Sequence, residues 1–117
     1  MSERSDVDYL QDIQEAIRRI RAYTAGMSYE EFLADEKTQD AVVRNLEVLG
    51  EAAKRLSQAL KQQHPTLPWR AIAGARDRLI HDYSAVNLEI VWAIVQQDLP
   101  GLATQIEEIL RQAAGNR

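Results

Sequence analysis

Residues 76–83 read RDRLIHDY and hold three side chains suited to chemistry on a phosphate: Arg76, His81 and Tyr83. They fall within about two turns of a helix. Arginine is a permanent cation whose fork fits phosphate oxygens, and histidine exchanges a proton near neutral pH without a large pKa shift. An arginine and a histidine at this spacing form the smallest set of groups that can cleave an RNA phosphodiester without a metal ion.

The blocks around this octapeptide make the signal more specific than an isolated Arg-x4-His pair. They are AVVRNLEVLGEAAKRL at 41–56, PWRAI at 68–72, VNLEIVW at 86–92 and DLP at 98–100. Together with the octapeptide, their order and wording resemble the HEPN-type ribonucleases, specifically the HepT-like toxins of prokaryotic toxin–antitoxin pairs. The resemblance extends over residues 8–112, and the octapeptide matches the Arg-x4-His-x-Tyr signature of that family.

The resemblance implies a HEPN fold and an endoribonuclease site at a homodimer interface, with the two motif helices facing a groove. His81 would act as general base or acid on the RNA 2′-hydroxyl or the leaving 5′-oxygen, and Arg76 would stabilise the phosphorane-like transition state. The products would be a 2′,3′-cyclic phosphate or 3′-phosphate and a 5′-hydroxyl, with no metal ion and no other cofactor. Supporting residues would be Asp77, which could orient His81, together with Arg78, Arg44, Asn45 and Glu51.

Tyr83 has a separate role in this resemblance. In HepT-like proteins the matching tyrosine receives AMP from a cognate antitoxin, a minimal nucleotidyltransferase, as in a type VII-like toxin–antitoxin system. A bulky anionic adduct at Tyr83 would block the phosphate groove by size and charge. From the residues alone, Tyr83 also fits a core or interface aromatic.

Helical geometry separates the members of the motif, because successive residues turn by about 100°. Arg76 and Tyr83 are seven apart and would share one face of a helix, as would Asp77 and His81, which are four apart. Arg76 and His81 would point about 140° apart in an unbroken helix. They can meet one phosphate if the helix frays near His81 or if two chains share the site, and both alternatives stay open.

Plainer interpretations of the same residues also stay open. His81 near the C-terminus of a helix would interact favourably with the helix dipole. Arg76 would pair with Asp82 at the surface, and Arg78 would pair with Asp77, although such pairs contribute little. The chain would then be a catalytically inactive HEPN module that binds a protein or RNA as a dimer, or a purely structural helical dimer.

Length and composition fit one domain, residues 1–117 with a core at about 7–112, and a cytoplasmic location is expected. The chain has no cysteine, no apolar run near the ~18 residues of a membrane span, and no apolar h-region of the signal-peptide kind after residues 1–6. It has no glycine-rich phosphate loop, so any nucleotidyl transfer would belong to a partner. The net charge of −4 argues against broad nucleic-acid binding but leaves room for a local basic cleft. Candidate cations are Arg70, Arg76, Arg78, Arg44, Lys54, Arg55 and Lys61.

The hydrophobic pattern is helical throughout, without sustained period-2 alternation. It predicts helices at residues 7–23, 29–34, 37–63, 68–73, 75–81, 87–97 and 99–113. Ser28 and Glu31 fit a capping box, and Asn87 fits an N-cap. Pro100 either kinks one long helix or opens a second. These segments predict an all-α, four- to five-helix up-and-down bundle.

Apolar residues recur at spacings of three and four, which predicts three buried stripes. The stripes are Leu10, Ile13, Ile17 and Ile20; Val42, Leu46, Leu49, Ala53, Leu56 and Leu60; and Leu88, Val91, Trp92, Val95, Leu99, Leu102, Ile106 and Leu110. Trp69 and Trp92 fit core or interface anchors better than base-stacking platforms. Glu47 and Glu51 are four apart and fit a solvated helix face better than a metal or acid–base site.

Overall fold

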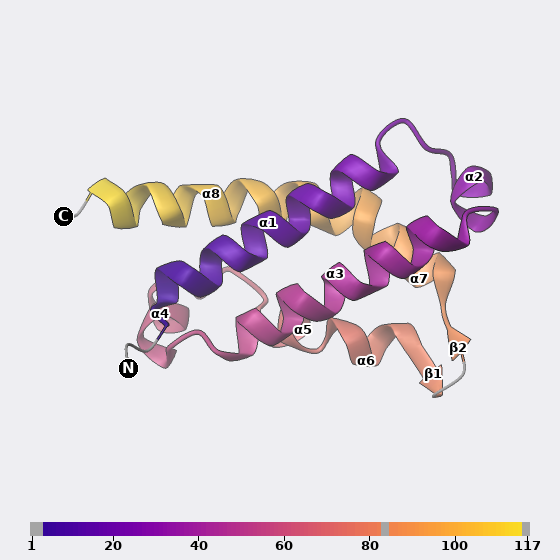
Figure 1. Cartoon of the computed structure of the whole chain (residues 1–117). Helices are drawn as coiled ribbons and strands as arrows, with labels where there is room; N and C mark the ends of the chain where they lie inside the picture. The colour runs from indigo at the N-terminus through magenta and orange to yellow at the C-terminus, as the bar shows by residue number, and fades with distance from the viewer. Residues whose placement is uncertain (1–3, 83–84, 116–117) are drawn as a thin grey trace.

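Three long helices form the framework of the chain, which the computed structural model describes over residues 4–82 and 85–115. They are α1 (Asp6–Thr24), α3 (Glu36–Lys54) and α8 (Leu99–Gly115). α1 packs along α3 and also contacts α8 (Figure 1). The shorter helices are α2 (Tyr29–Leu33), α4 (Gln58–Gln63), α5 (Trp69–Ala73), α6 (Ala75–Leu79), α7 (Leu88–Ala93) and the π-helical turn η1 (Ile94–Asp98).

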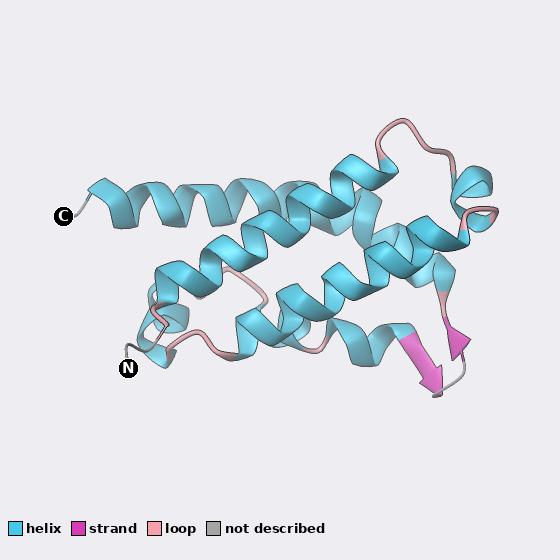
Figure 2. Cartoon of the chain, viewed as in Figure 1, coloured by secondary structure: helices cyan, strands magenta, loops and turns pink. Residues whose placement is uncertain are grey.

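The direction of the chain reverses along the bundle. α1 runs toward one end of the molecule, α3 returns, α6 runs out again, and α7 through α8 return once more (Figure 1). This arrangement confirms the predicted all-α up-and-down bundle. Two short strands, β1 (Ile80–Asp82) and β2 (Ala85–Val86), interrupt the helices at one end (Figure 2). Within residues 4–82 and 85–115, no helix is long and apolar enough to cross a membrane.

The predicted stripes build the core that joins the framework helices. Leu10, Ile17 and Leu46 are at most 2% exposed, and so are Val91 and Ile106. Burying one such aliphatic side chain contributes about 1.5–3 kcal/mol. The two tryptophans belong to the same core: the Trp92 ring lies 5.1 Å from that of Phe32, and Trp69 Nε1 donates to the His64 carbonyl at 2.9 Å. Trp69 is buried in the core and Trp92 is half-buried against it, so both fill one of the two roles that the sequence predicted, core or interface anchor.

Local capping sets the starts of the helices. The predicted capping box of α2 is present, since Glu31 N donates to Ser28 Oγ at 3.1 Å and Ser28 N donates to Glu31 Oε1 at 3.0 Å. The backbone hydrogen bond from Ser28 lowers the pKa of Glu31. Asn87 caps α7, because its Oδ1 accepts from Ile90 N at 3.1 Å. These contacts confirm both capping predictions.

The single helix predicted over residues 37–63 is wrong, because α3 ends at Lys54 and α4 begins at Gln58. The break is fixed by Ser57, whose Oγ accepts from Leu60 N at 3.1 Å and so caps α4. The Asp6 carboxylate, at the start of α1, accepts from Ser57 N at 2.8 Å and from Ser57 Oγ at 2.6 Å. Bonds from a segment 51 residues away thus override the helical periodicity.

Pro100 does not open a separate helix, since the chain is helical without a break from α7 through η1 into α8. In η1 the Leu99 amide donates to the Ile94 carbonyl, five residues back rather than four. A proline ring presses on the carbonyl four residues before it in an ordinary α-helix, and it has no N–H to donate. The wider π turn accommodates Pro100 within one continuous, bent helix.

Candidate active site

The octapeptide is divided between a helix and a strand. Arg76 is the second residue of α6, and His81 is the central residue of β1. The predicted motif helix over residues 75–81 is therefore too long by two residues, and the predicted alignment of Asp77 with His81 on one helix face is wrong. The structure describes only the backbone at Arg76 and His81, and Tyr83 lies outside the described residues. Arg76 and His81 could meet one phosphate if the helix ended near His81 or if two chains shared the site. The structure shows the first condition, because α6 ends at Leu79.

A short antiparallel ladder ends the helix. Ile80 pairs with Val86 and Asp82 with Ala85, with an irregularity in register between the two pairs. β-branched residues such as Ile80 and Val86 favour extended backbone over helix. The Asn87 cap begins α7 directly after β2, so the strands end where this helix starts. The hydrophobic pattern does not predict this ladder, because two- and three-residue strands are too short to show alternation.

The position of α6 depends on a close backbone contact at Gly50 of α3. A Cβ atom at Gly50 would lie 3.2 Å from the Ala73 carbonyl oxygen and 3.3 Å from that of Ile72, at the end of α5. Gly74 follows, and its carbonyl accepts from Asp77 N at 3.0 Å, which starts α6. The bend predicted at Gly74 is therefore present. Because Gly50 lets α5 approach α3 so closely, it fixes where α6 begins and therefore where the backbone of Arg76 lies.

The outer face of α3 carries two hollows that share residues. The α1–α3 hollow has a volume of about 500 Å³ and is lined by Arg4, Tyr9, Asp12, Arg44, Glu47, Val48, Gly50, Glu51, Ala52, Lys54, Arg55 and Ala73. The α3–β2 hollow has a volume of about 400 Å³ and is lined by Gln39, Asp40, Val43, Arg44, Glu47, Val86 and Leu88. Arg44 and Glu47 line both, so the two hollows adjoin along the helix.

The supporting residues predicted from the sequence are divided between different surfaces. Arg44 and Glu51 are exposed and line the α1–α3 hollow. The Asn45 side chain is half-buried, lines neither hollow on this face, and donates from Nδ2 to the Ala41 carbonyl at 2.9 Å. Arg78 lines a third hollow of about 350 Å³, with Asp98 among its lining residues. The structure thus brings Arg44 and Glu51 together but places Asn45 and Arg78 elsewhere.

Asp77 is exposed, and among the side chains that the structure describes it forms no ion pair with Arg78. The surface pair considered for these two residues is therefore absent. Glu51 does pair with Arg55, at 3.3 Å, as expected for a solvated helix face. In the described part of the chain, no group of three or more His, Asp or Glu side chains could hold a metal ion.

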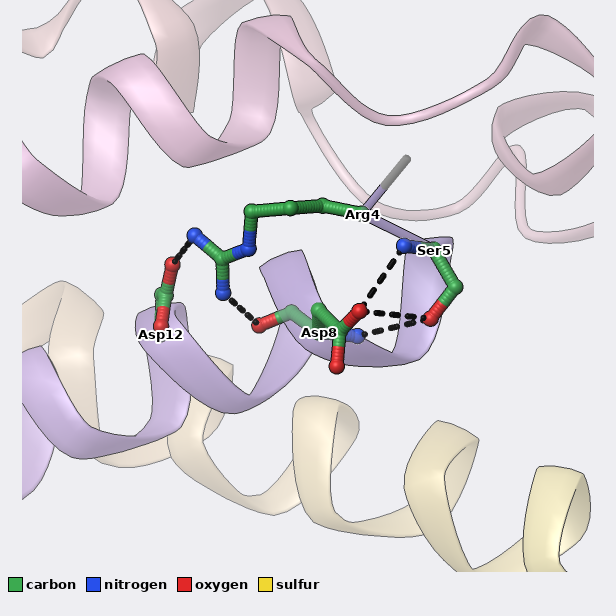
Figure 3. A network of polar contacts seen from close by, with 4 residues as sticks. All are labelled: Arg4, Ser5, Asp8 and Asp12. Atoms are coloured by element: carbon green, nitrogen blue, oxygen red, sulfur yellow. Dashed lines mark hydrogen bonds and ion pairs between the residues drawn. The ribbon is translucent and has the colours of Figure 1, made fainter. Parts of the chain in front are cut away.

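Three polar residues of the α1–α3 hollow, Arg4, Tyr9 and Asp12, were not predicted from the sequence. Figure 3 shows the contacts of Arg4 and Asp12. Arg4 donates from Nη1 to Asp12 Oδ2 at 2.6 Å and from Nη2 to the Asp8 carbonyl at 3.3 Å (Figure 3). Its guanidinium carbon also lies 4.9 Å from the centre of the Tyr9 ring. The hydrogen bond to Asp12 raises the pKa of Arg4. The four-residue spacing of Arg4, Asp8 and Asp12, beside a Ser5–Asp8 capping box, was the available signal.

Comparisons with known proteins place this geometry in context. The family model described as "Ribonuclease HepT-like" matches residues 13–109. "Probable ribonuclease HepT" of Thermococcus cleftensis is 45% identical over 106 residues, covering 91% of this chain and 96% of that protein. "Putative RNase MJ0127" of Methanocaldococcus jannaschii is 44% identical, covering 92% of this chain and 88% of that protein. No solved structure matches this chain.

Proposed function

This chain belongs to the HepT-like ribonuclease family, and we propose that it is a metal-independent endoribonuclease, the toxin of a type VII-like toxin–antitoxin pair. The observation that carries the proposal is the extent of the family match. It covers residues 13–109, which include the whole octapeptide and the α3 face beside it. Family membership alone confirms the ribonuclease class predicted from the sequence. The roles of individual residues of this chain in the reaction are our assignment.

The reaction we propose is a transesterification within the RNA. The 2′-oxygen attacks the adjacent phosphorus, and the bond from phosphorus to the 5′-oxygen breaks. A histidine takes the proton of the 2′-hydroxyl, and the leaving 5′-oxygen gains a proton, so the products are a 2′,3′-cyclic phosphate and a 5′-hydroxyl. We assign the proton transfer to His81. Arg76, earlier in the same octapeptide, stabilises the extra negative charge on the phosphorane-like transition state.

A homodimer would supply two copies of each group to one groove. Each chain carries one Arg76 and one His81, while the reaction needs both a base and an acid. If the groove draws arginine from one chain and histidine from the other, two inactive variants should complement each other. Mixing Arg76→Ala with His81→Ala subunits would then restore part of the activity through mixed dimers. Failure to restore activity, with mixed dimers demonstrated by mass spectrometry, would place both groups in one chain.

The central test is cleavage of RNA in the presence of EDTA. We expect wild-type protein to cleave, His81→Ala to lose cleavage by about 10²–10⁴-fold, and His64→Ala to cleave normally. His64 is a matched control because it is the other histidine of the chain and ends α4, outside both hollows on the outer face of α3. Expression of the wild type alone should also arrest growth, and His81→Ala should relieve the arrest. If the wild type binds RNA but does not cleave it, the protein is instead a catalytically inactive RNA-binding module.

We further propose that a nucleotidyltransferase antitoxin transfers AMP to Tyr83. The support is sequence position, since Tyr83 lies two residues after His81 and completes the family signature. An adenylyl group there would bring negative charge and bulk to the phosphate groove. Co-expression with such a partner should raise the intact mass by adenylyl units in the wild type but not in Tyr83→Phe. Tyr23→Phe is the control, because Tyr23 is 42% exposed and lies on α1; persistence of the mass shift in Tyr83→Phe would refute the assignment.

A further inference from the structure

We propose that the α1–α3 hollow is a subsite for single-stranded RNA, which holds a nucleotide beside the one that is cleaved. This inference rests on the proposed ribonuclease function and adds residues that no part of that function requires: Lys54, Tyr9 and Arg4. Single-stranded nucleic-acid sites combine cations that follow the backbone with aromatic rings on which bases stack. The hollow has both kinds of group, in a volume of about 500 Å³.

The charge of the hollow differs from that of the chain as a whole. Its lining holds four cations, Arg4, Arg44, Lys54 and Arg55, against three carboxylates, although the net charge of the chain is −4. Arg4 and Arg55 are paired with carboxylates of the same lining. Within the described residues, neither Arg44 nor Lys54 forms an ion pair, and both are exposed. These two cations are therefore free to meet RNA phosphates without first breaking a pair.

Tyr9 and Arg4 supply the base-binding part. Tyr9 is half-buried, with its ring packed against the core, so its orientation is fixed before RNA arrives. Arg4 lies over that ring, with its guanidinium carbon 4.9 Å from the ring centre. Arg4 is also held by Asp12 and the Asp8 carbonyl (Figure 3). Unstacked RNA bases stack on tyrosine rings and on arginine guanidinium planes. Because Arg4 covers the Tyr9 ring, the guanidinium is the surface on which a base would stack, and Tyr9 supports it. Such a surface favours a single strand, whose bases are accessible, over a duplex.

The hollow lies beside the catalytic motif. Ala73 lines it, and Arg76 follows three residues later, so their Cα atoms lie within about 11 Å of each other. At its other side, Arg44 leads into the α3–β2 hollow, which is lined by Val86. Val86 pairs with Ile80, the residue before His81. A strand that follows the outer face of α3 would thus pass from the α1–α3 hollow along α6 and β1.

Binding should be measured in the His81→Ala background, so that the RNA stays intact, by fluorescence anisotropy with a short labelled single-stranded RNA. We expect Arg44→Gln and Lys54→Gln each to weaken binding about fivefold. Each should also make the negative slope of log affinity against log salt shallower by about 0.7, because each variant loses one phosphate contact. Tyr9→Leu should weaken binding about tenfold with the slope unchanged, because the ring that supports the Arg4 guanidinium is lost. Tyr9→Phe should keep the parental affinity, because this support needs the ring and not the hydroxyl.

Lys37→Gln is the matched control. Lys37 is exposed, lies on the same helix, loses the same charge and lines neither hollow, so affinity and slope should stay within about twofold of the parent. Parental affinity and slope in Arg44→Gln and Lys54→Gln would overturn the subsite. If the wild type still cleaves RNA in EDTA, only the subsite fails; if it neither cleaves nor binds RNA, the proposed function fails with it.

Discussion

Two regions of the molecule are stabilised in different ways. One is the framework of α1, α3 and α8, and the other is the motif arm of α6, β1 and β2. The framework helices are 19, 19 and 17 residues long, and each buries a continuous apolar stripe. The elements of the motif arm are five, three and two residues long. Helices and hairpins this short are not stable on their own in water. The arm is therefore positioned by its contacts with the framework, above all the approach of α5 to Gly50, and changes in the two regions should have different consequences.

The largest effects should come from changes in the motif arm, such as those at Arg76. We expect Arg76→Ala to lower the rate of RNA cleavage by about 10³-fold, because the stabilisation of transition-state charge that we assign to Arg76 would be lost, while the melting temperature stays close to that of the wild type. The cleavage rate of Arg76→Lys should lie between those of the wild type and Arg76→Ala, since lysine keeps the charge but lacks the bidentate guanidinium. Single-turnover cleavage and thermal melts measure the two quantities.

Arg70 provides the comparison for Arg76. It is exposed on α5, six residues earlier, and it lines neither hollow on the outer face of α3. Arg70→Ala should cleave at the wild-type rate. An equal loss in both variants would mean that general positive charge, rather than one placed guanidinium, drives the activity.

A framework change should show the opposite pattern. Leu46 is 0% exposed in α3, and Leu46→Ala should lower the free energy of unfolding by about 3 kcal/mol, from lost burial and a residual cavity. Cleavage per folded molecule should change little at a temperature where the variant is folded. Leu33→Ala is the control, because Leu33 is 44% exposed and its truncation should cost well under about 1 kcal/mol. Urea denaturation of both variants tests this, and equal costs would contradict the burial argument.

Gly50 joins the two regions, so its substitution should affect both properties. In Gly50→Ala the new Cβ would press on the Ala73 and Ile72 carbonyl oxygens at 3.2 and 3.3 Å, and backbone cannot rotate away as a side chain can. We expect a loss of about 1 kcal/mol in stability, the net of overpacking and better helix propensity. Cleavage should fall about tenfold, because α6 moves with α5 and the arginine it carries is misplaced.

Gly101→Ala separates these contributions. Gly101 lies in α8, where an added Cβ atom would point into open space, so alanine there should raise stability by about 0.5–1 kcal/mol and leave cleavage unchanged. A Gly50→Ala protein with wild-type stability and activity would show that the α5–α6 segment does not depend on this contact.

The same contrast explains what could be predicted from the sequence. Framework helices were found because each carries many residues of one period. The start of the shorter α2 was found because its cap is a local side-chain contact, the Ser28–Glu31 box. The break before Ser57 could not be found, since it depends on Asp6, far away in the chain. The hairpin after Leu79 is too short to have a period. Arg44 and Glu51 were predicted as site residues and share a hollow, but Tyr9 enters it only through the packing of α1 on α3.

The smallest effect should be the response of the framework to acid. The hydrogen bond from Arg18, and then that from Arg19, lower the pKa of Glu15 in α1 to about 2. A pKa lowered by folding means that the charged carboxylate stabilises the fold. That stability is complete above about pH 4.5, the ordinary glutamate value, and is lost as the pH falls toward 2.

All three side chains are exposed, so the contribution is small and salt screens it. The melting temperature of the wild type should therefore fall slightly more between pH 4.5 and 2 than that of Glu15→Gln, and the difference should shrink in high salt. If His81 transfers the proton, cleavage should instead change with pH near neutrality, where histidine side chains titrate. If activity and folding are instead lost together between pH 4.5 and 2, the reaction does not depend on a histidine. The activity of the motif arm would then depend on pH only through the stability of the framework.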